Sequence, residues 1–183
     1  MKKVLICNCP PQTGKDEFVK YLSYKYGIAH LEFKDKLIKL TKMIYDVSDE
    51  SWNSIYVSGE KDKPRQEFDG RSARQALIYV SEDVIKPKFG ESYFGKCAVN
   101  NLRIGVNGFS DGGFYEEMIE VVNHVGKENA LIIRIDKEGR CFKDDSRGYV
   151  DIEGVEVIKV DNNGSLGQLH KQADNIYNYL LHK

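Results

Sequence analysis

Residues able to hold a phosphate group stand near the start of the chain. The stretch Cys9-Pro10-Pro11-Gln12-Thr13-Gly14-Lys15-Asp16 corresponds to the phosphate-binding pattern G-x-x-x-x-G-K-[ST]. In that pattern backbone N–H groups surround the phosphates, the lysine reaches the β and γ oxygens, and the final hydroxyl holds Mg²⁺. Gly14 and Lys15 match the pattern, whereas Cys9 replaces its first glycine and Asp16 replaces its final hydroxyl residue. The stretch therefore predicts binding of a nucleoside triphosphate, the donor in phosphoryl transfer.

The predicted loop lies between a strand and a helix. The apolar run Val4-Leu5-Ile6 comes before it, and apolar residues at helical spacing follow over 18–26. A helix N-terminus carries a partial positive charge that favours anions, and Lys15 adds a cation there. Asp16 alone would repel an anion, so it suits either a metal ion between carboxylate and phosphate or a helix cap. An ordinary β–α turn with a surface lysine is the alternative interpretation.

Strands and helices alternate along the remaining chain. Strands are predicted at 29–33, 102–106, 130–135 and 155–160. Helices are predicted at 37–44, 71–85 with an end near Pro87, 94–102, 118–125 and 165–180, the last opened by the capping pattern S-x-x-Q at Ser165. The segment 46–70 is polar, with an exposed loop at 61–65, and 140–150 is a polar loop that contains glycine. The alternation predicts an α/β domain with a mostly parallel sheet flanked by helices.

Composition argues against several classes of protein. The 183 residues predict one domain, and the formal net charge of −1 does not favour nucleic acid as a partner, because binding phosphates along a duplex needs a basic surplus. No stretch approaches the roughly 18 apolar residues that span a membrane. Four cysteines without metal-ligand spacing predict free thiols and a cytoplasmic protein. The four histidines form no pattern typical of a catalytic triad or a metal cluster.

Five further segments, taken together with the loop, resemble those of a known family. They are Phe33-Lys34-Asp35-Lys36-Leu37 (F-x-D-x-L), Ser72-Ala73-Arg74-Gln75-Ala76-Leu77 (S-P-R-x-x-L, with Ala73 for Pro), Phe89-Gly90-Glu91-Ser92-Tyr93-Phe94 (F-G-x-x-F/Y-W), Ser110-Asp111-Gly112-Gly113-Phe114 (S-D-x-R-F) and Asp161-Asn162-Asn163-Gly164-Ser165-Leu166 (N-x-G-S/T-L). Together with Gly14-Lys15-Asp16, they resemble phage-type deoxynucleoside monophosphate kinases of the P-loop superfamily. The resemblance implies a single three-layer P-loop kinase-like domain over 1–183, with an acceptor-binding helical region at about 33–102 and a lid at about 136–150.

The resemblance also implies an activity, which is ATP-dependent phosphorylation of a (deoxy)nucleoside monophosphate to the diphosphate. Mg²⁺ would be the cofactor and small-molecule nucleotides the partners. The catalytic residues would be Lys15, Arg74 and Asp35. The ATP phosphates would be bound by Thr13, Gly14, Lys15, Asp16, Glu17, Arg140 and Arg147, the acceptor by Phe33, Asp35, Arg65, Arg71 and Arg74, and the metal by Asp16 and, through water, Asp111. A guanidinium suits the role of Arg74, because it can bind a phosphate through two parallel hydrogen bonds. The protein would act in the cytoplasm, that of an infected host cell if its gene belongs to a phage.

Each assignment has a structural alternative. Arg74 could face solvent, Asp35 could cap a helix, and Asp111 could be an ordinary turn residue. The other arginines could be solvated, although Arg140 and Arg147 are favoured because 140–150 falls where lids of this family lie. Three aromatic residues could line a base pocket or pack in the core, namely Trp52, Tyr56 and Phe68.

Two positions depart from the family's pattern. Gly113 stands where the family's turn has an arginine, so another arginine must supply that cation. Cys9 stands at the first glycine of the loop, which requires a changed backbone because cysteine resists a positive φ. Two other functions stay open: a kinase that acts on a modified pyrimidine, free or in DNA, and a degenerate nucleotide-binding protein that no longer catalyses. The accepted base and the oligomeric state, a homodimer included, are left open as well.

Overall fold

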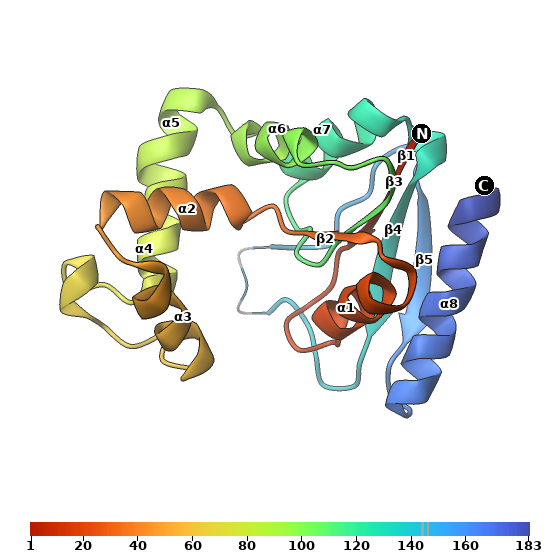
Figure 1. Ribbon diagram of the computed structural model, residues 1–183, viewed down its shortest axis with the longest axis horizontal. Coiled ribbons are helices and arrows are strands. Elements are labelled where there is room, and N and C mark those ends of the chain that lie inside the picture. Colours follow the sequence, from red (N-terminus) through yellow and green to blue (C-terminus); the bar gives the residue numbers. More distant parts are fainter. Residues whose placement is uncertain (144, 146) are drawn as a thin grey trace. The chain divides into compact units, whose positions relative to one another are not determined.

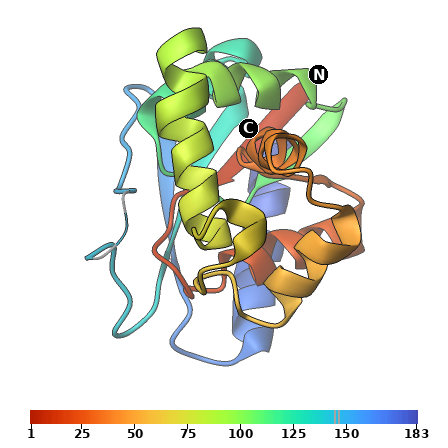
Figure 2. The ribbon, with the colours of Figure 1, turned by 90° about the vertical axis from the view of Figure 1, so that its left-hand side faces the viewer.

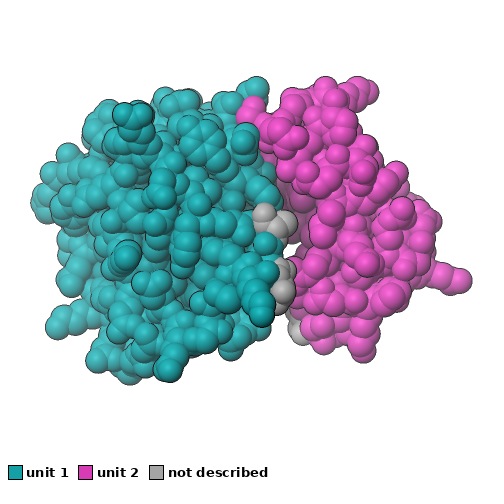
Figure 3. Space-filling view, turned by 180° about the vertical axis from the view of Figure 1, so that it is seen from behind, with its two compact units in different colours: residues 1–33, 95–183 teal, residues 34–94 magenta. Residues whose placement is uncertain are grey.

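The chain divides into two units, which Figure 3 colours separately: Met1–Phe33 with Gly95–Lys183 form unit 1, and Lys34–Phe94 form unit 2. The structure is a computed structural model that describes residues 1–143, 145 and 147–183, without the side chain of Val57. Each unit is described by itself. No helix within the described residues is both long and apolar enough to span a bilayer.

Unit 1 is built on a five-stranded sheet in which every neighbouring pair of strands is parallel. The strand order is β2-β3-β1-β4-β5, so β1 lies at the centre (Figure 1). The strands are β1 (Lys2–Cys7), β2 (Ala29–Leu31), β3 (Gly105–Phe109), β4 (Ala130–Asp136) and β5 (Glu156–Asp161). The predicted α/β class with a parallel sheet is therefore confirmed.

Helices cover both faces of this sheet. They are α1 (Lys15–Tyr26), α6 (Tyr93–Asn100), α7 (Tyr115–Val125) and α8 (Leu166–His182), with a 3₁₀ turn at Lys127–Asn129. Successive residues of β1 point to opposite faces. Val4 and Ile6 join the core formed with α6 and α7, whereas Leu5 and Cys7 join the core formed with α1 and α8. Burial on both faces explains why the strand is a continuous apolar run, as is typical of parallel sheets.

The strand predicted at 102–106 is present but displaced by three residues, because β3 spans Gly105–Phe109. Leu102 is buried but ends the turn that follows α6. Two residues of β3 interrupt the apolar pattern by which a strand is recognised in a sequence. Asn107 is fully buried and uses its side chain to bind backbone groups. At Gly108 a Cβ would lie 2.8 Å from the side chain of Val19, so the packing of α1 leaves no room for the apolar residue typical of a strand.

Unit 2 is helical. Its elements are α2 (Asp35–Ile44), α3 (Asp49–Val57), a 3₁₀ turn (Gln66–Phe68), α4 (Ala73–Tyr79), a π-helical segment (Val80–Ile85) and α5 (Lys86–Phe89). Figure 2 shows the last three as one continuous rod. The rod passes beyond the predicted end near Pro87, and this proline lies in the first turn of α5, directly after the π-helical segment.

Helix α3 lies in the segment 46–70, which the sequence marked only as polar. Ser48 caps it by accepting a hydrogen bond from the Ser51 N–H at 3.2 Å. Trp52 is 4% exposed and meets the ring of the fully buried Phe68 edge to face, with the ring centroids 6.0 Å apart. These aromatic residues therefore form the core of unit 2, which is the packing alternative considered above.

Long-range polar contacts hold α8 to the rest of unit 1. The ammonium of Lys3, on β1, donates to the carbonyl oxygens of Leu180 and Leu181 at 2.6 and 3.1 Å. A cation at this position suits the negative end of the helix dipole. The predicted capping box at Ser165 is present at the other end of α8.

Asp174, on α8, joins this helix to α1. It accepts hydrogen bonds from the hydroxyls of Tyr21 and Tyr26 at 3.0 and 2.9 Å and from Lys25 Nζ at 2.8 Å. Burial raises the pKa of Asp174, but the bonds from Lys25, Tyr26 and Tyr21 lower it below its ordinary value overall. The ionised form is therefore the one that stabilises the contact between the two helices.

We expect Asp174→Asn to lower the melting temperature by about 2–6 °C, because one amide oxygen cannot replace a carboxylate that accepts from three donors. Since the folded pKa is lowered, this contribution is present above the ordinary pKa of about 3.9 and is lost as the pH falls through the folded value. Thermal unfolding from pH 3 to 7 measures both effects. Asp151→Asn, which alters a carboxylate whose side chain is 79% exposed, is the control. An equal change in the two variants would contradict the assigned role.

Candidate functional site

The loop between β1 and α1 has its left-handed backbone at Gln12, with φ 62°, and at Gly14, with φ 96°. Cys9 does not adopt a positive φ, so the conformation that a first glycine would permit is not used there. Thr13 Oγ1 and Lys15 Nζ both donate to the carbonyl of Pro10, at 3.1 and 3.2 Å. The loop therefore curls around its own carbonyl at the N-terminus of α1.

Cys9 fixes the beginning of this loop to β4. Its Sγ donates to the Ile133 carbonyl at 3.3 Å and accepts from the Ile135 N–H at 3.2 Å. Its side chain is fully buried, and all four cysteines of the chain are free thiols. Replacement of the first glycine by Cys9 thus adds a direct attachment to the neighbouring strand.

Asn8 connects the loop to two other segments. Its Nδ2 donates to the carbonyls of Gly112 at 3.2 Å and Gly148 at 2.8 Å, and its Oδ1 accepts from the Val150 N–H at 2.7 Å. The side chain is fully buried. Asn8 was not among the residues predicted from the sequence, although a polar residue directly after a buried strand is a signal that could have identified it.

Asp111 lies at the carboxyl end of β3, which neighbours β1 in the sheet. Its Oδ1 accepts from the Phe33 N–H at 2.8 Å, and the residue is 9% exposed. The preceding Ser110 donates to Glu32 Oε1 at 3.2 Å and is hydrogen-bonded to His30 Nε2 at 3.0 Å. The carboxyl edge of a parallel α/β sheet is where such folds bind ligands.

Arg147 reaches the same region from the segment between β4 and β5. Its Nε and Nη2 donate to the two carboxylate oxygens of Asp145, at 2.8 and 2.6 Å. A Cβ added at Gly113 would lie 2.5 Å from Arg147 Cδ, so the arginine side chain covers that glycine. Two other residues of the predicted lid at 136–150, Asp144 and Ser146, lie outside the described residues.

Charges from three segments interact at this edge of the sheet. The hydrogen bond to Asp145 raises the pKa of Arg147, and the charges of Asp111 and Asp16 raise it further. The hydrogen bond from Arg147 lowers the pKa of Asp145, and the charge of Lys15 contributes to the same shift. The charges of two cations and three carboxylates of unit 1 therefore influence one another.

Other predicted residues of unit 1 do not join this group. Glu17 points to α8, where it pairs with His170 at 2.9 Å. Arg140 is exposed in the turn after β4. The ring of Phe33 is stacked on Phe109 in the core, with the centroids 4.6 Å apart, and only its backbone N–H contacts Asp111.

The remaining predicted residues belong to unit 2. Asp35 is the first residue of α2. Arg65 pairs with Glu60 at 2.8 Å, the guanidinium of Arg71 lies 4.5 Å from the centroid of the Tyr79 ring, and Arg74 pairs with Asp62 at 2.6 Å. The Arg74 and Asp62 side chains are 55% and 59% exposed, so this ion pair is solvated and weak.

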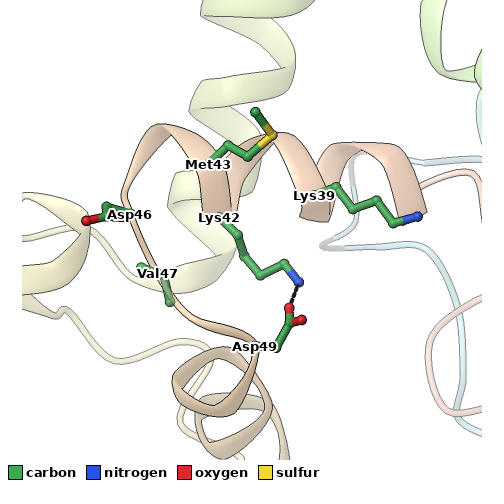
Figure 4. A pocket seen from close by; sticks show the side chains of 6 residues that line it. All are labelled: Lys39, Lys42, Met43, Asp46, Val47 and Asp49. Atoms are coloured by element: carbon green, nitrogen blue, oxygen red, sulfur yellow. Dashed lines mark hydrogen bonds and ion pairs between the residues drawn. The ribbon is translucent and has the colours of Figure 1, made fainter.

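Unit 2 also contains a shallow surface depression of about 470 Å³ (Figure 4). It is lined by Lys39, Lys42, Met43, Asp46, Val47 and Asp49. Lys42 forms an ion pair with Asp49 across it. None of these residues was predicted as functional, and surface lysines beside a carboxylate do not define a ligand.

The protein side chains alone do not form a metal site in the described part of the chain. No group of three or more His, Cys, Asp or Glu residues suited to a metal occurs within 1–143, 145 and 147–183. The carboxylates that the sequence predicts for a Mg²⁺ are those of Asp16 and Asp111, and an ion that arrives with phosphates commonly takes one or two carboxylates together with phosphate oxygens and water.

We expect Gly14→Ala to reduce the free energy of unfolding by about 2–3 kcal/mol, since it combines strained backbone with a steric clash. Gly14 has φ 96°, and a Cβ there would lie 2.5 Å from Asn162 Nδ2, which donates to the Thr13 carbonyl at 2.8 Å. Gly27→Ala is the matched control, because Gly27 has φ 68° but open space around it. Urea unfolding measures both variants. Equal losses would show that Asn162 does not restrain the loop.

Comparison with known proteins assigns the chain to no family. Neither protein-family models nor curated protein sequences match it. The interpretation of function therefore depends on the residues that unit 1 gathers at the carboxyl edge of its sheet, and on the resemblance of individual segments described above.

Proposed function

We propose that the protein transfers the γ-phosphoryl group of ATP to a (deoxy)nucleoside monophosphate. The observation that carries this proposal is the placement of Lys15 and Asp16 in the first turn of α1, with Asp111 just after the neighbouring β3 and both carboxylates acting on the charge of Arg147. Phosphoryl transfer requires mainly that a protein position two anions and neutralise the charge that develops between them. Two cations beside a helix N-terminus suit that task.

Lys15 is the cation proposed for the triphosphate. It is only 8% exposed, and its ammonium donates to the neutral carbonyl of Pro10 at 3.2 Å. A phosphate oxygen is a stronger acceptor, because it carries charge. Binding of ATP would therefore exchange a bond to a neutral acceptor for one in which both partners are charged.

Arg147 is the second cation. The family that the chain resembles has an arginine at the position of Gly113, and the methylene chain of Arg147 lies over this glycine. This placement supports catalysis and argues against a degenerate protein that only binds nucleotide. Mg²⁺, bound to Asp16 and through water to Asp111, would neutralise phosphate charge.

Unit 2 would bind the acceptor. Arg74 is the proposed ligand of its phosphate, with Arg65, Arg71 and Asp35 as further candidates. The solvated pair of Arg74 with Asp62 leaves the guanidinium accessible to an anion. The partners would then be small nucleotides, and free thiols suit a cytoplasmic protein.

The activity is tested with a panel of nucleoside and deoxynucleoside monophosphates and Mg-ATP, and the release of ADP is measured. Turnover with one or more monophosphates is expected. Turnover restricted to a modified pyrimidine would instead support the alternative kinase, and ATP binding without any turnover would support the degenerate protein.

We expect Lys15→Met to lower kcat about 100-fold or more, because it removes a cation from the transferring phosphates. Methionine is unbranched and only one atom shorter than lysine, so the melting temperature should change little. Lys20→Met, at an exposed position of α1, is the control and should retain activity. Undiminished turnover in a folded Lys15→Met protein would refute the role of the loop.

For Arg74→Lys we expect a loss of about 10- to 150-fold in kcat/KM for the acceptor, with ATP affinity nearly constant. Lysine keeps the charge but cannot form two parallel hydrogen bonds, and a charge-assisted contact contributes about 1.5–3 kcal/mol. Steady-state kinetics with each substrate varied separates the two effects. Arg103→Lys, at an exposed position of unit 1, is the control. A fall in ATP affinity without a fall in acceptor use would reverse the roles of Arg74 and Lys15.

A further inference from the structure

Arg147 lies over a position that has no side chain. A Cβ at Gly113 would lie 2.5 Å from Cδ of Arg147, 2.7 Å from its Cγ and 2.8 Å from its Cβ. Carbon atoms do not approach this closely, so the methylene chain of Arg147 fills the space that a larger residue at 113 would need. Glycine at 113 is therefore a requirement for the observed position of Arg147.

Asp145 fixes the other end of the arginine. The guanidinium donates two hydrogen bonds to its carboxylate, from Nε at 2.8 Å and from Nη2 at 2.6 Å, and the Arg147 N–H donates a third at 3.0 Å. The side chains of Arg147 and Asp145 are 21% and 13% exposed, so the pair is largely shielded from water. Such a bidentate pair restricts both the position and the plane of the guanidinium.

The carboxylate of Asp145 also interacts with Lys15. The hydrogen bond from Arg147 is the main cause that lowers the pKa of Asp145, and the charge of Lys15 adds to the shift. One carboxylate therefore interacts with both cations that the proposed function assigns to phosphates. Asp16 and Asp111 act on the same guanidinium, so its surroundings hold more negative than positive charge before any anion binds.

We propose that Asp145 is a positioning residue, which holds Arg147 over Gly113 until nucleotide binds and then yields the guanidinium to the phosphate groups. The inference rests on the proposed function, because it takes Lys15 and Arg147 as the phosphate-binding cations. A phosphate group offers the same two-oxygen geometry as the carboxylate and more charge. Asp145 thus prepares the orientation of Arg147 and at the same time competes with the ligand for it.

The competition predicts that removal of the Asp145 charge strengthens binding. We expect Asp145→Asn to bind inorganic tripolyphosphate about tenfold more tightly than wild type in isothermal titration calorimetry at fixed salt, because no charged pair has to be broken. A residue that served only to support the fold would give unchanged or weaker binding. Asp151→Asn is the matched control, since Asp151 also pairs with an arginine, Arg134, at 2.8 Å, and its binding should stay within twofold of wild type.

Gly113→Ala tests the other support of Arg147. Its methyl group would displace the arginine side chain, so we expect tripolyphosphate to bind at least fivefold more weakly. Gly148→Ala, next to Arg147 with nothing within 4 Å of an added Cβ, should bind as wild type does. Equal binding by Gly113→Ala and wild type would overturn the proposed position of Arg147.

The outcomes separate this inference from the function on which it rests. If wild type binds tripolyphosphate and Asp145→Asn binds it no more tightly, the inference fails and the proposed function stands. If wild type itself does not bind tripolyphosphate, both fail. Unfolding curves for each variant show whether a loss of binding follows from a loss of fold.

Discussion

The buried side-chain amide of Asn8 is the contact on which the site in unit 1 depends. It donates to the carbonyls of Gly112 and Gly148 and accepts from the N–H of Val150. An ionised carboxylate cannot donate, and a hydroxyl has one proton to give, so neither could satisfy all three partners. The end of β1, the turn after β3 and the segment before β5 are thereby held at fixed distances from one another. The charged residues that these segments carry are brought together as a consequence.

The loop after β1 reaches its shape with residues other than those of the usual pattern. The left-handed backbone falls on Gln12 and Gly14, while Cys9 takes an ordinary φ and binds β4 through its sulfur. Gly113, where the family that the chain resembles has an arginine, is covered by the side chain of Arg147 from another segment. A motif defined by residue types counts Cys9 and Gly113 as mismatches. In the fold, Cys9 binds β4 and Gly113 makes room for Arg147, and neither contact would be possible with a glycine at 9 or an arginine at 113.

Sequence reasoning succeeded where the signal is local. The strand–loop–helix at the start, the capping box at Ser165 and the parallel α/β class all follow from neighbouring residues or from the alternation of elements. The bounds of β3 were not predicted correctly, because the buried Asn107 binds backbone groups that it meets only in the fold. Helix α3 was not predicted, because its apolar face is short. The partners of Asn8 lie more than 100 residues away, so a local pattern can mark it as a polar residue after a buried strand but cannot identify the groups that it binds. The same holds for the fit of Arg147 over Gly113.

The contact between Lys3 and the last turn of α8 has a consequence for how the chain acquires its fold. Its two ends, at Lys3 and Leu180, are 177 positions apart in sequence. The central strand β1 also pairs with β3 and β4, which follow it by about a hundred residues. During synthesis β1 therefore cannot pair with its neighbouring strands until most of the chain has left the ribosome. Contacts so distant in sequence slow folding, and they leave an apolar strand exposed to aggregation or to chaperones in the meantime.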